Sequence, residues 1–392
     1  MKKILALSTS YPLRPDSVSG IFVHNLYKAM ADSWSIELLC PDDNRPSGGV
    51  MDGITVVPVR YMPKKLQTLG GAGGILPSLK TSPIKLLLLP LLLASLLIQT
   101  LIKARKADVI HANWAICGII AAVAGKFSGK KVVLTLRGSD VEKSRSSAVF
   151  KWQLQLALAG ADFIVCISEG MKSDLLRAYP NYVDKIGYCL NGVDSVFFAS
   201  QSAAIDPDGS LQILAVGALI PVKGFDVLLK ALHLLPMDTH YVLTIVGEGP
   251  ERPALQARIK HYGLEEKVIL KSELPYRDIP EIMASSDLFV LSSRAEGRPN
   301  VVVEAIASGL PVVSSDLPGV HGLVKPGLNG WLFEVGNAQA LSLRILQALE
   351  NKKNLRLMGQ SGREAIRAHS GWPATAGYYS KLFTGLITGT ST

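Results

Sequence analysis

The stretch Ala295–Val313 reads A-E-G-R-P-N-V-V-V-E-A-I-A-S-G-L-P-V-V. Its residues indicate where a loop ends, where a helix begins and ends, and where the next strand begins. It follows the apolar run Asp287–Leu291, so we expect its first residues to form a loop at the carboxyl end of a strand. Pro299 is typical of the first turn of a helix, and Gly309 followed by Pro311 is typical of a helix end. The stretch therefore predicts a strand–loop–helix–strand unit.

The start of this helix predicts an anion site between two carboxylates. The N–H groups of Val301 and Val302 would face the anion, as helix N-termini face phosphate. Glu296 precedes the helix and Glu304 lies one turn inside it, and carboxylates accept hydrogen bonds from sugar hydroxyls. A sugar nucleotide matches both features. The alternative is a surface helix whose early glutamates stabilise its dipole.

Aliphatic and β-branched runs recur between helical stretches in two series. The first series comprises Ile4–Ser8, Ile36–Cys40, Ile54–Val59, Val109–Ala112, Val132–Leu136 and Phe163–Ile167. The second comprises Gln212–Val216, Val242–Val246, Val268–Leu270, Leu288–Leu291 and Val312–Ser314. Apolar strands that alternate with helices indicate parallel sheets covered on both faces, so the fold class is α/β with two doubly wound domains. The polar segment Ala199–Ser210 is the expected linker.

The net positive charge lies entirely in the first half of the chain. Residues 1–190 contain 23 Lys and Arg against 13 Asp and Glu, whereas residues 191–392 contain 18 against 19. A basic half can face nucleic acid, an anionic membrane or a phosphorylated substrate. No basic helix interleaved with aromatic residues is present, so nucleic acid is not the expected partner.

Several protein classes are disfavoured. The chain has no G-x-x-x-x-G-K-[ST], H-E-x-x-H or G-x-S-x-G motif, which argues against P-loop NTPases, zinc proteases and serine hydrolases.

Its four cysteines form no C-x-x-C pair and no metal-ligand cluster stands out, so we expect reduced thiols in the cytoplasm. The first apolar run ends at Leu7 without a cleavage site, which predicts a strand rather than a signal peptide.

The segment Ile84–Ile102, I-K-L-L-L-L-P-L-L-L-A-S-L-L-I-Q-T-L-I, is nearly long enough to span a bilayer. Lys85, Pro90 and Gln99 interrupt it, and one crossing would place the flanking strands on opposite sides of the membrane. Two other interpretations stay open. The helix is buried against the sheet, or one of its faces enters the membrane interface, where the flanking Lys and Arg would contact headgroups. The basic first half favours the second.

Polar residues follow the strands of the first series. Gly20 opens a helix after the first strand and lets backbone approach a ligand. His111 ends one strand, and Arg137 and Asp140 follow the next, so they can face an acceptor hydroxyl and a donor phosphate. The alternatives are a structural histidine and a turn in which Asp140 caps a helix.

Two glycines and a lysine follow strands of the second series. Gly217 ends a strand and Lys223 precedes the next helix, a position that suits a diphosphate clamp. The alternative is a solvated loop lysine. Gly247 begins a G-E-G motif after another strand, but the third glycine of a dinucleotide fingerprint is missing.

Together these residues resemble the retaining nucleotide-sugar glycosyltransferases of family 4, the "glycosyl transferases group 1" type of bacterial polysaccharide and glycolipid biosynthesis. The matching segments are S-G-I-F-V-H-N at Ser19, H-A-N-W at His111, T-L-R-G-S-D at Thr135, N-G-V-D-S-V-F-F at Asn191, V-K-G-F-D at Val222, V-G-E-G-P at Val246, and the stretch from Glu296 to Val313. The resemblance implies the GT-B architecture, two facing Rossmann-like domains with a donor cleft between them.

The resemblance also implies residue roles. Lys223, Glu296, Arg137, Asp140 and His111 would serve catalysis, with Lys223 on the diphosphate and Glu296 on the sugar hydroxyls. The implied donor-binding set is Gly20, Gly217, Lys223, Gly247, Glu296, Arg298, Asn300, Val301, Val302 and Glu304, in which Glu304 would bind the ribose.

Three positions depart from the pattern of the family. Ala218 stands where many members have an arginine, so Arg298 or Arg137 would have to supply that charge. Arg137 stands where many members have a histidine, and Gly322 stands where an acidic residue is frequent.

The resemblance implies an N-terminal acceptor-side domain of residues 1–195, a nucleotide-sugar domain of residues 196–368, and a helix in residues 369–392 that crosses back to the first domain. We expect transfer from a UDP- or GDP-sugar, without a metal or other cofactor, to a lipid-linked or polysaccharide acceptor at the cytoplasmic face of the membrane. A GT-B sugar-nucleotide epimerase and a catalytically weak scaffold subunit are the alternatives.

Overall fold

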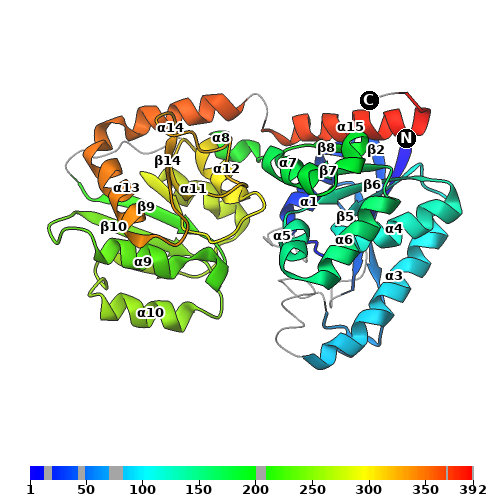
Figure 1. Ribbon diagram of the computed structural model, residues 1–392, viewed down its shortest axis with the longest axis horizontal. Coiled ribbons are helices and arrows are strands. Elements are labelled where there is room, and N and C mark those ends of the chain that lie inside the picture. Colours follow the sequence, from blue (N-terminus) through cyan, green and yellow to red (C-terminus); the bar gives the residue numbers. More distant parts are fainter. Residues whose placement is uncertain (13–19, 43–48, 70–82, 200–208, 368–369, 391–392) are drawn as a thin grey trace. The chain divides into compact units, whose positions relative to one another are not determined.

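The computed structural model describes residues 1–12, 20–42, 49–69, 83–199, 209–367 and 370–390 (Figure 1). The chain forms two compact units, Met1–Gly192 with Trp372–Thr392, and Val193–Gly371. The sequence predicts domain boundaries after residues 195 and 368. In the structure the chain passes from one unit to the other after Gly192 and after Gly371. The expected linker Ala199–Ser210 lies mostly outside the described residues.

The first unit contains an eight-stranded sheet in the order β3-β4-β2-β1-β5-β6-β7-β8. Its strands are β1 Lys2–Leu7, β2 Trp34–Pro41, β3 Gly49–Met51, β4 Ile54–Val59, β5 Val109–Asn113, β6 Lys131–Leu136, β7 Phe163–Cys166 and β8 Ile186–Tyr188. All pairs are parallel except β3 with β4. The strand order reverses between β1 and β5, and such a switch point is where open α/β sheets bind ligands at the carboxyl ends of their strands.

Helices cover both faces of this sheet. They are α1 Ile21–Met30, α3 Leu89–Ala104, α4 Ala115–Ser128, α5 Ser139–Ser146, α6 Ala148–Gly160, α7 Glu169–Ala178 and α15 Trp372–Thr388, with 3₁₀ turns η1 Lys64–Leu66, η2 Pro83–Leu88 and η3 Pro180–Lys185. Alternate residues of β1 point to opposite faces. Leu5 and Leu7 join a core with α3, α4, α6 and α7, whereas Ile4 and Ala6 join a core with α1 and α15. The last helix therefore completes the first unit.

The second unit contains a six-stranded sheet in the order β11-β10-β9-β12-β13-β14, in which every pair is parallel. Its strands are β9 Leu211–Val216, β10 Tyr241–Val246, β11 Val268–Lys271, β12 Leu288–Leu291, β13 Val312–Ser315 and β14 Gly330–Phe333. This is the doubly wound order of dinucleotide-binding folds, and its switch point lies between β9 and β12.

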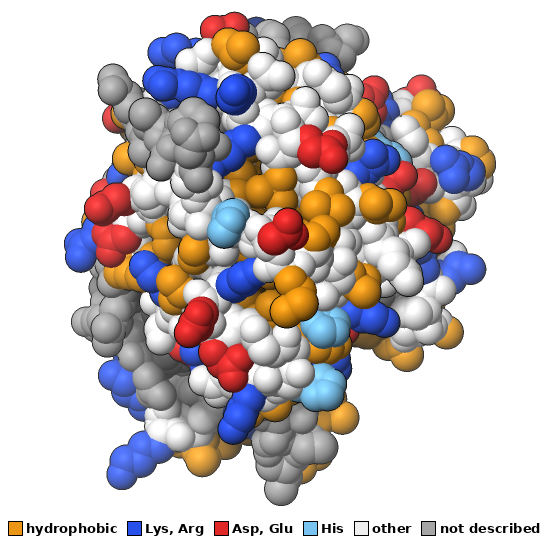
Figure 2. Space-filling view, turned by 90° about the vertical axis from the view of Figure 1, so that its left-hand side faces the viewer, with side chains coloured by type: hydrophobic (Ala, Val, Ile, Leu, Met, Phe, Trp, Pro, Cys, Tyr) orange, Lys and Arg blue, Asp and Glu red, His pale blue; other side chains and the backbone are white. Residues whose placement is uncertain are grey.

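Helices also cover both faces of the second sheet. They are α8 Ser195–Ala199, α9 Phe225–His233, α10 Arg252–His261, α11 Ile279–Ala284, α12 Asn300–Ala307, α13 Ala338–Glu350 and α14 Lys352–Arg367, with 3₁₀ turns η4 Pro221–Lys223 and η5 Tyr276–Asp278. α9, α10 and α13 share one core with the sheet, and α8, α11 and α12 share the other. In Figure 2 acidic and basic side chains are interspersed on the face shown, in keeping with the nearly neutral second half of the sequence.

Candidate functional site

Lys223 and Glu296 form an ion pair at the switch point of the second unit. Lys223 lies in the loop after β9 and Glu296 in the loop after the neighbouring β12, and Lys223 Nζ is 2.6 Å from Glu296 Oε1. Ser293 Oγ donates a hydrogen bond of 2.7 Å to the same oxygen. The two charged side chains are 23% and 13% exposed, so a ligand can reach both. A cation for phosphate and a carboxylate for hydroxyls thus stand side by side.

Hydrogen bonds between the two loops fix this pair. Arg294 binds both carboxylate oxygens of Asp226, at 2.9 and 2.7 Å, and also donates to the carbonyl of Pro221 at 2.6 Å. Burial would raise the pKa of Asp226, but the hydrogen bonds from Arg294 lower it. Ser292 Oγ donates to the carbonyl of Lys223 at 3.0 Å. The loop of the lysine is therefore hydrogen-bonded to the loop that carries the glutamate.

Gly224 is required directly after the lysine. Its φ is +65°, and a Cβ there would lie 2.1 Å from the carbonyl oxygen of Ser292. No other residue permits both this backbone conformation and this contact. The glycine of V-K-G-F-D therefore has a structural role, because it lets the Lys223 loop lie against the end of β12.

Gly217 and Gly247 lie together at the ends of β9 and β10. A Cβ on Gly247 would lie 2.0 Å from the carbonyl oxygen of Gly217. The Lys223 side chain passes over Gly217, whose Cβ would be 3.6 Å from Lys223 Cε. The second glycine of G-E-G, Gly249, would place a Cβ 2.4 Å from the carbonyl oxygen of Leu219. Close backbone packing therefore explains Gly247 and Gly249, whereas a Cβ on Gly217 would make only ordinary contact.

The predicted helix begins at Asn300, directly after Pro299. Asn300 and Val301 lie in its first turn, next to the buried Arg298. The N–H of Val302 donates to the carbonyl of Pro299 at 3.1 Å, so the prediction that it faces an anion is wrong for this structure. The N–H of Val302 is used by the first turn of the helix, because it donates to the carbonyl of Pro299.

The loop that contains Gly322 contacts the Glu296 segment through Gly319, a contact that the sequence did not predict. A Cβ on Gly319 would lie 2.5 Å from the carbonyl oxygen of Gly297 and 2.6 Å from that of Glu296. The dipeptide Pro318-Gly319 was the available signal. Gly322, the position that departs from the pattern of the family, lies in open space with a φ of +82°.

Glu304 is hydrogen-bonded to a tyrosine that sequence reasoning missed. Tyr276 Oη donates to Glu304 Oε1 at 3.1 Å, and the tyrosine ring packs edge-on against Phe197. Burial and, to a smaller extent, the charge of Asp194 raise the pKa of Glu304 to about 7, against the opposing effect of the hydrogen bond from Tyr276. The expected ribose-binding carboxylate therefore titrates near neutral pH.

This pKa predicts a pH-dependent stability. Between the ordinary pKa of 4.5 and the folded value of about 7, the native state holds more protons than the unfolded state. The stabilisation from protonated Glu304 is thus complete below the first value and lost as pH rises through the second. Relative to Glu304→Gln, the wild type should lose roughly 1–3 kcal/mol of unfolding free energy over this range, measured by urea denaturation. Parallel curves for the two proteins would contradict this, and the exposed Glu266→Gln is the control.

In the first unit, Arg137 is buried and held by two asparagines. Its Nε and Nη2 donate to Asn113 Oδ1 at 3.1 and 2.6 Å, and its Nη1 donates to Asn191 Oδ1 at 2.8 Å. The guanidinium lies 5.0 Å from the centre of the Phe22 ring, and burial lowers the pKa of Arg137. Asn113 and Asn191 lie in the motifs H-A-N-W and N-G-V-D, but their role was not predicted.

Asp140 bonds to backbone rather than to another side chain in this structure. Its two oxygens accept hydrogen bonds of 3.1 Å each, one from the N–H of Arg137 and one from the N–H of Ala115 at the start of α4. Burial raises the pKa of this carboxyl. These bonds correspond to the alternative that the sequence left open, since they fix the turn after β6 and bind the first N–H of a helix.

His111 is fully buried, and both ring nitrogens are hydrogen-bonded. Nδ1 lies 2.9 Å from Tyr27 Oη and Nε2 lies 2.8 Å from Thr135 Oγ1. Burial lowers the pKa of His111 well below its usual range. The predicted contact between His111 and an acceptor is wrong for this structure, because the histidine points into the core between β5, α1 and α15.

These bonds continue into a buried network. Tyr379 of α15 lies 2.9 Å from Thr135, and Asn113 Nδ2 donates to Tyr27 Oη at 3.1 Å. Hydrogen bonds therefore run without a break from α15 through Thr135 and His111 to Tyr27, Asn113 and finally Arg137.

Gly20 lies directly before α1 with a φ of +72°, and a Cβ there would lie 2.8 Å from the carbonyl oxygen of Ser10. It brings the start of α1 against the loop after β1, at the switch point of this sheet. The structure thus brings Gly20, Asn113 and Arg137 to the carboxyl ends of β1, β5 and β6.

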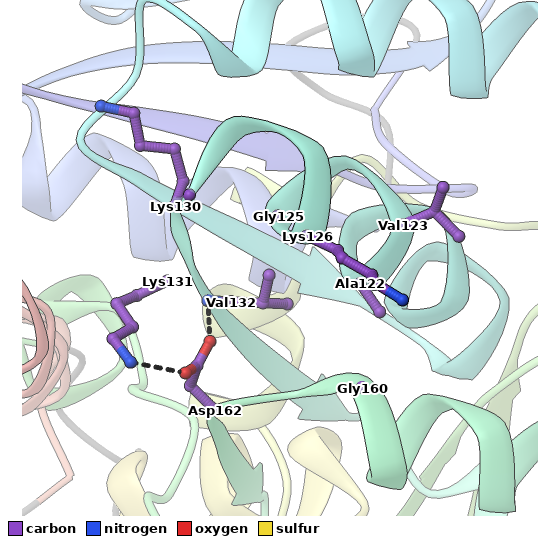
Figure 3. A pocket seen from close by; sticks show the side chains of 10 residues that line it. Ala122, Val123, Gly125, Lys126, Lys130, Lys131, Val132, Gly160 and Asp162 are labelled. Carbon is purple, nitrogen blue, oxygen red and sulfur yellow. Dashed lines mark hydrogen bonds and ion pairs between the residues drawn. The ribbon is translucent and has the colours of Figure 1, made fainter.

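A hollow of about 550 Å³ lies at the opposite edge of the first sheet (Figure 3). Lys126, Lys130 and Lys131 line it, and their ammonium groups point away from one another in Figure 3. Lys131 pairs with Asp162 at 2.9 Å. Because these charges do not converge, we do not assign a ligand here. Among the described residues, no group of His, Cys, Asp and Glu is placed to hold a metal ion.

Two family patterns match the chain. Residues 19–197 match the pattern described as "Glycosyltransferase Family 4", and residues 199–365 match "Glycosyl transferases group 1". One relative from Escherichia coli, a UDP-Gal:alpha-D-GlcNAc-diphosphoundecaprenol alpha-1,3-galactosyltransferase, is 29% identical over 285 residues, which cover 68% of this chain and 72% of the relative.

Two solved structures have the same fold. Sucrose-phosphate synthase from Thermosynechococcus elongatus superimposes with a TM-score of 0.81 at 19% identity, over 99% of this chain and all of that one. Anabaena HepE in complex with UDP-glucose gives 0.76 at 19% identity, over 98% of this chain and all of that one. These similarities confirm the GT-B fold class expected from the sequence.

Proposed function

Because the chain belongs to the group 1 glycosyltransferases, we propose that it transfers a sugar from a nucleoside diphosphate donor to a hydroxyl acceptor with retention at the anomeric carbon. The observation that carries this proposal is the Lys223–Glu296 pair at the switch point of the second sheet. A diphosphate needs a cation, and a sugar needs acceptors for its hydroxyl groups. The pair supplies both at 2.6 Å from each other.

The donor would be bound by three groups of the second unit. Lys223 contacts the diphosphate, Glu296 accepts from the sugar hydroxyls, and Glu304 accepts from the ribose. The amides of Asn300 and Val301 assist at the start of α12. A bound diphosphate attracts Lys223 away from Glu296, so the carboxylate becomes available to the sugar at the same step.

We propose a front-face displacement, as the resemblance implies. The bond from the anomeric carbon to the phosphate oxygen breaks as the acceptor oxygen forms its bond on the same face, and the departing phosphate accepts the proton of the acceptor. Lys223 stabilises the charge that grows on the diphosphate, an effect that is large in a cleft with little water. Side chains thus supply the positive charge, and the proposed reaction needs no resident metal.

We propose a lipid-linked or polysaccharide acceptor at the cytoplasmic face of a membrane. The excess of Lys and Arg in residues 1–190 supports this location, because anionic lipids attract basic surfaces. The name of the Escherichia coli relative, which includes a diphosphoundecaprenol-linked sugar, supports the acceptor class. The same name and the Anabaena complex favour a UDP-sugar as the donor.

A thermal-shift screen of UDP-, GDP- and ADP-sugars tests the proposal. A donor that binds only the native state at about 100 times its Kd stabilises it by about 2.7 kcal/mol, which raises Tm. The donor that raises Tm is then incubated with lipid-linked acceptors and with none. Transfer supports the proposal, whereas epimerised donor or free sugar without an acceptor favours the epimerase. No shift with any donor would refute the proposed donor site.

A further inference from the structure

The apolar segment before β5 lies on the surface of the first unit. Lys85–Ala104 is long and apolar enough to cross a bilayer, with a mean hydropathy of 2.1, yet only 17% of it is buried. It connects β4 and β5, which belong to one sheet. A crossing would place these strands on opposite sides of a membrane, so the sheet excludes it.

One face of α3 packs on the protein and the other carries a row of aliphatic side chains. The buried residues are Leu92, Leu96, Thr100 and Ala104. The exposed ones, with their exposed fractions, are Leu91 at 45%, Ile98 at 57% and Ile102 at 64%, and Leu87 of the preceding turn η2 extends the row at 74%. The spacing of Leu91, Ile98 and Ile102 keeps them on one side of α3 over roughly 16 Å. The helix runs along the periphery of its unit (Figure 1).

The charges around this row have a single sign. From Gly53 to Ala107 the chain has no Asp or Glu and eight Lys and Arg. Arg105 and Lys106 are exposed just beyond α3. At the other end Lys64 and Lys65 of η1 are exposed, and Lys85 of η2 bonds to the nearby carbonyl of Thr68 at 3.5 Å. Lys103 does not count among them, because it pairs with Glu37.

We infer that the exposed face of α3 docks on an anionic lipid bilayer, with the helix parallel to the membrane surface. The aliphatic row Leu87, Leu91, Ile98 and Ile102 enters the boundary between headgroups and acyl chains, and the cations at both ends contact anionic headgroups. A second copy of this chain does not fit, because two identical basic surfaces repel each other. The inference deepens the proposed function, on which its link to a lipid-linked acceptor rests.

Vesicle sedimentation tests the docking. The probe is phosphatidylcholine with about 30% phosphatidylglycerol, compared with pure phosphatidylcholine, at low and high salt. We expect the wild type to bind the anionic vesicles and Leu91→Gln/Ile98→Gln to bind them at least about tenfold more weakly. Arg105→Gln/Lys106→Gln should bind more weakly and lose part of the salt dependence, because Lys64, Lys65 and Lys85 remain.

Matched controls come from the second unit. Leu343→Gln/Leu357→Gln alters side chains that are 65% and 64% exposed, and Lys353→Gln/Arg356→Gln removes two exposed cations of α14; both should bind like the wild type. Equal binding by the Leu91/Ile98 variant, or no binding by the wild type, would overturn the inference. So would a wild-type dimer that this variant abolishes. The assay contains no donor, so its failure would leave the transfer reaction standing.

Discussion

Replacing Lys223 with alanine is expected to lower kcat for sugar transfer by about 100- to 1000-fold at saturating donor. The lysine stabilises charge that grows on the diphosphate as the glycosidic bond breaks, so its loss affects the transition state more than the ground state. The fold should persist, because the ion pair is partly exposed and Ser293 still bonds to Glu296. Steady-state kinetics and a melting curve measure both effects.

Variants of Glu296, the carboxylate paired with Lys223, test the same prediction in a second way. Glu296→Ala should also abolish most transfer, and the double variant should lose much less than the product of the two single losses, because the pair acts as one unit. Lys260→Ala, an exposed lysine of α10, is the control for charge and should behave like the wild type. Near-wild-type transfer by either single variant at saturating donor would show that the site is assigned wrongly.

Replacing Arg137 with alanine is expected to destabilise the first unit by about 2–4 kcal/mol and to abolish most transfer. The substitution removes the three hydrogen bonds that Arg137 donates to the side-chain carbonyls of Asn113 and Asn191. It also removes a cation from the switch point of the first sheet. Urea denaturation should show a lower midpoint for the first unit.

Arg137→Lys separates the two effects. It keeps the charge but not the geometry of three hydrogen bonds, so it should recover part of the stability and less of the activity. Arg145→Ala, which removes an arginine with a 60% exposed side chain, is the control and should change the midpoint little. An unchanged midpoint for Arg137→Ala would contradict the structural part of the prediction.

Much of the fold was predictable because its strands are continuous apolar runs. The strands that the two series omitted, β3, β8 and β14, are only three or four residues long and each contains a glycine. Such runs carry too few apolar residues to stand out from loops. The strand order was not predictable either, since it depends on which strands pair across long stretches of sequence.

The site was predictable where parallel strands end and less so where partners are distant in sequence. Lys223 and Glu296 each follow a strand, and these two strands are parallel neighbours. Both side chains therefore lie at the same edge of the sheet. Tyr276 reaches Glu304 from the 3₁₀ turn η5, and no spacing in the sequence indicated this contact. His111 illustrates the reverse error, because a strand-end histidine resembles a site residue until its buried partners are known.

The position of α15 has a consequence for synthesis on the ribosome. The second unit, Val193–Gly371, is continuous, whereas the first needs residues from Trp372 onward to cover one face of its sheet. The domain translated first is therefore the last to finish folding, and until then its apolar surface above β1 and β5 remains available to chaperones. Nascent chains arrested before α15 emerges should expose this surface to protease although the second unit is already resistant.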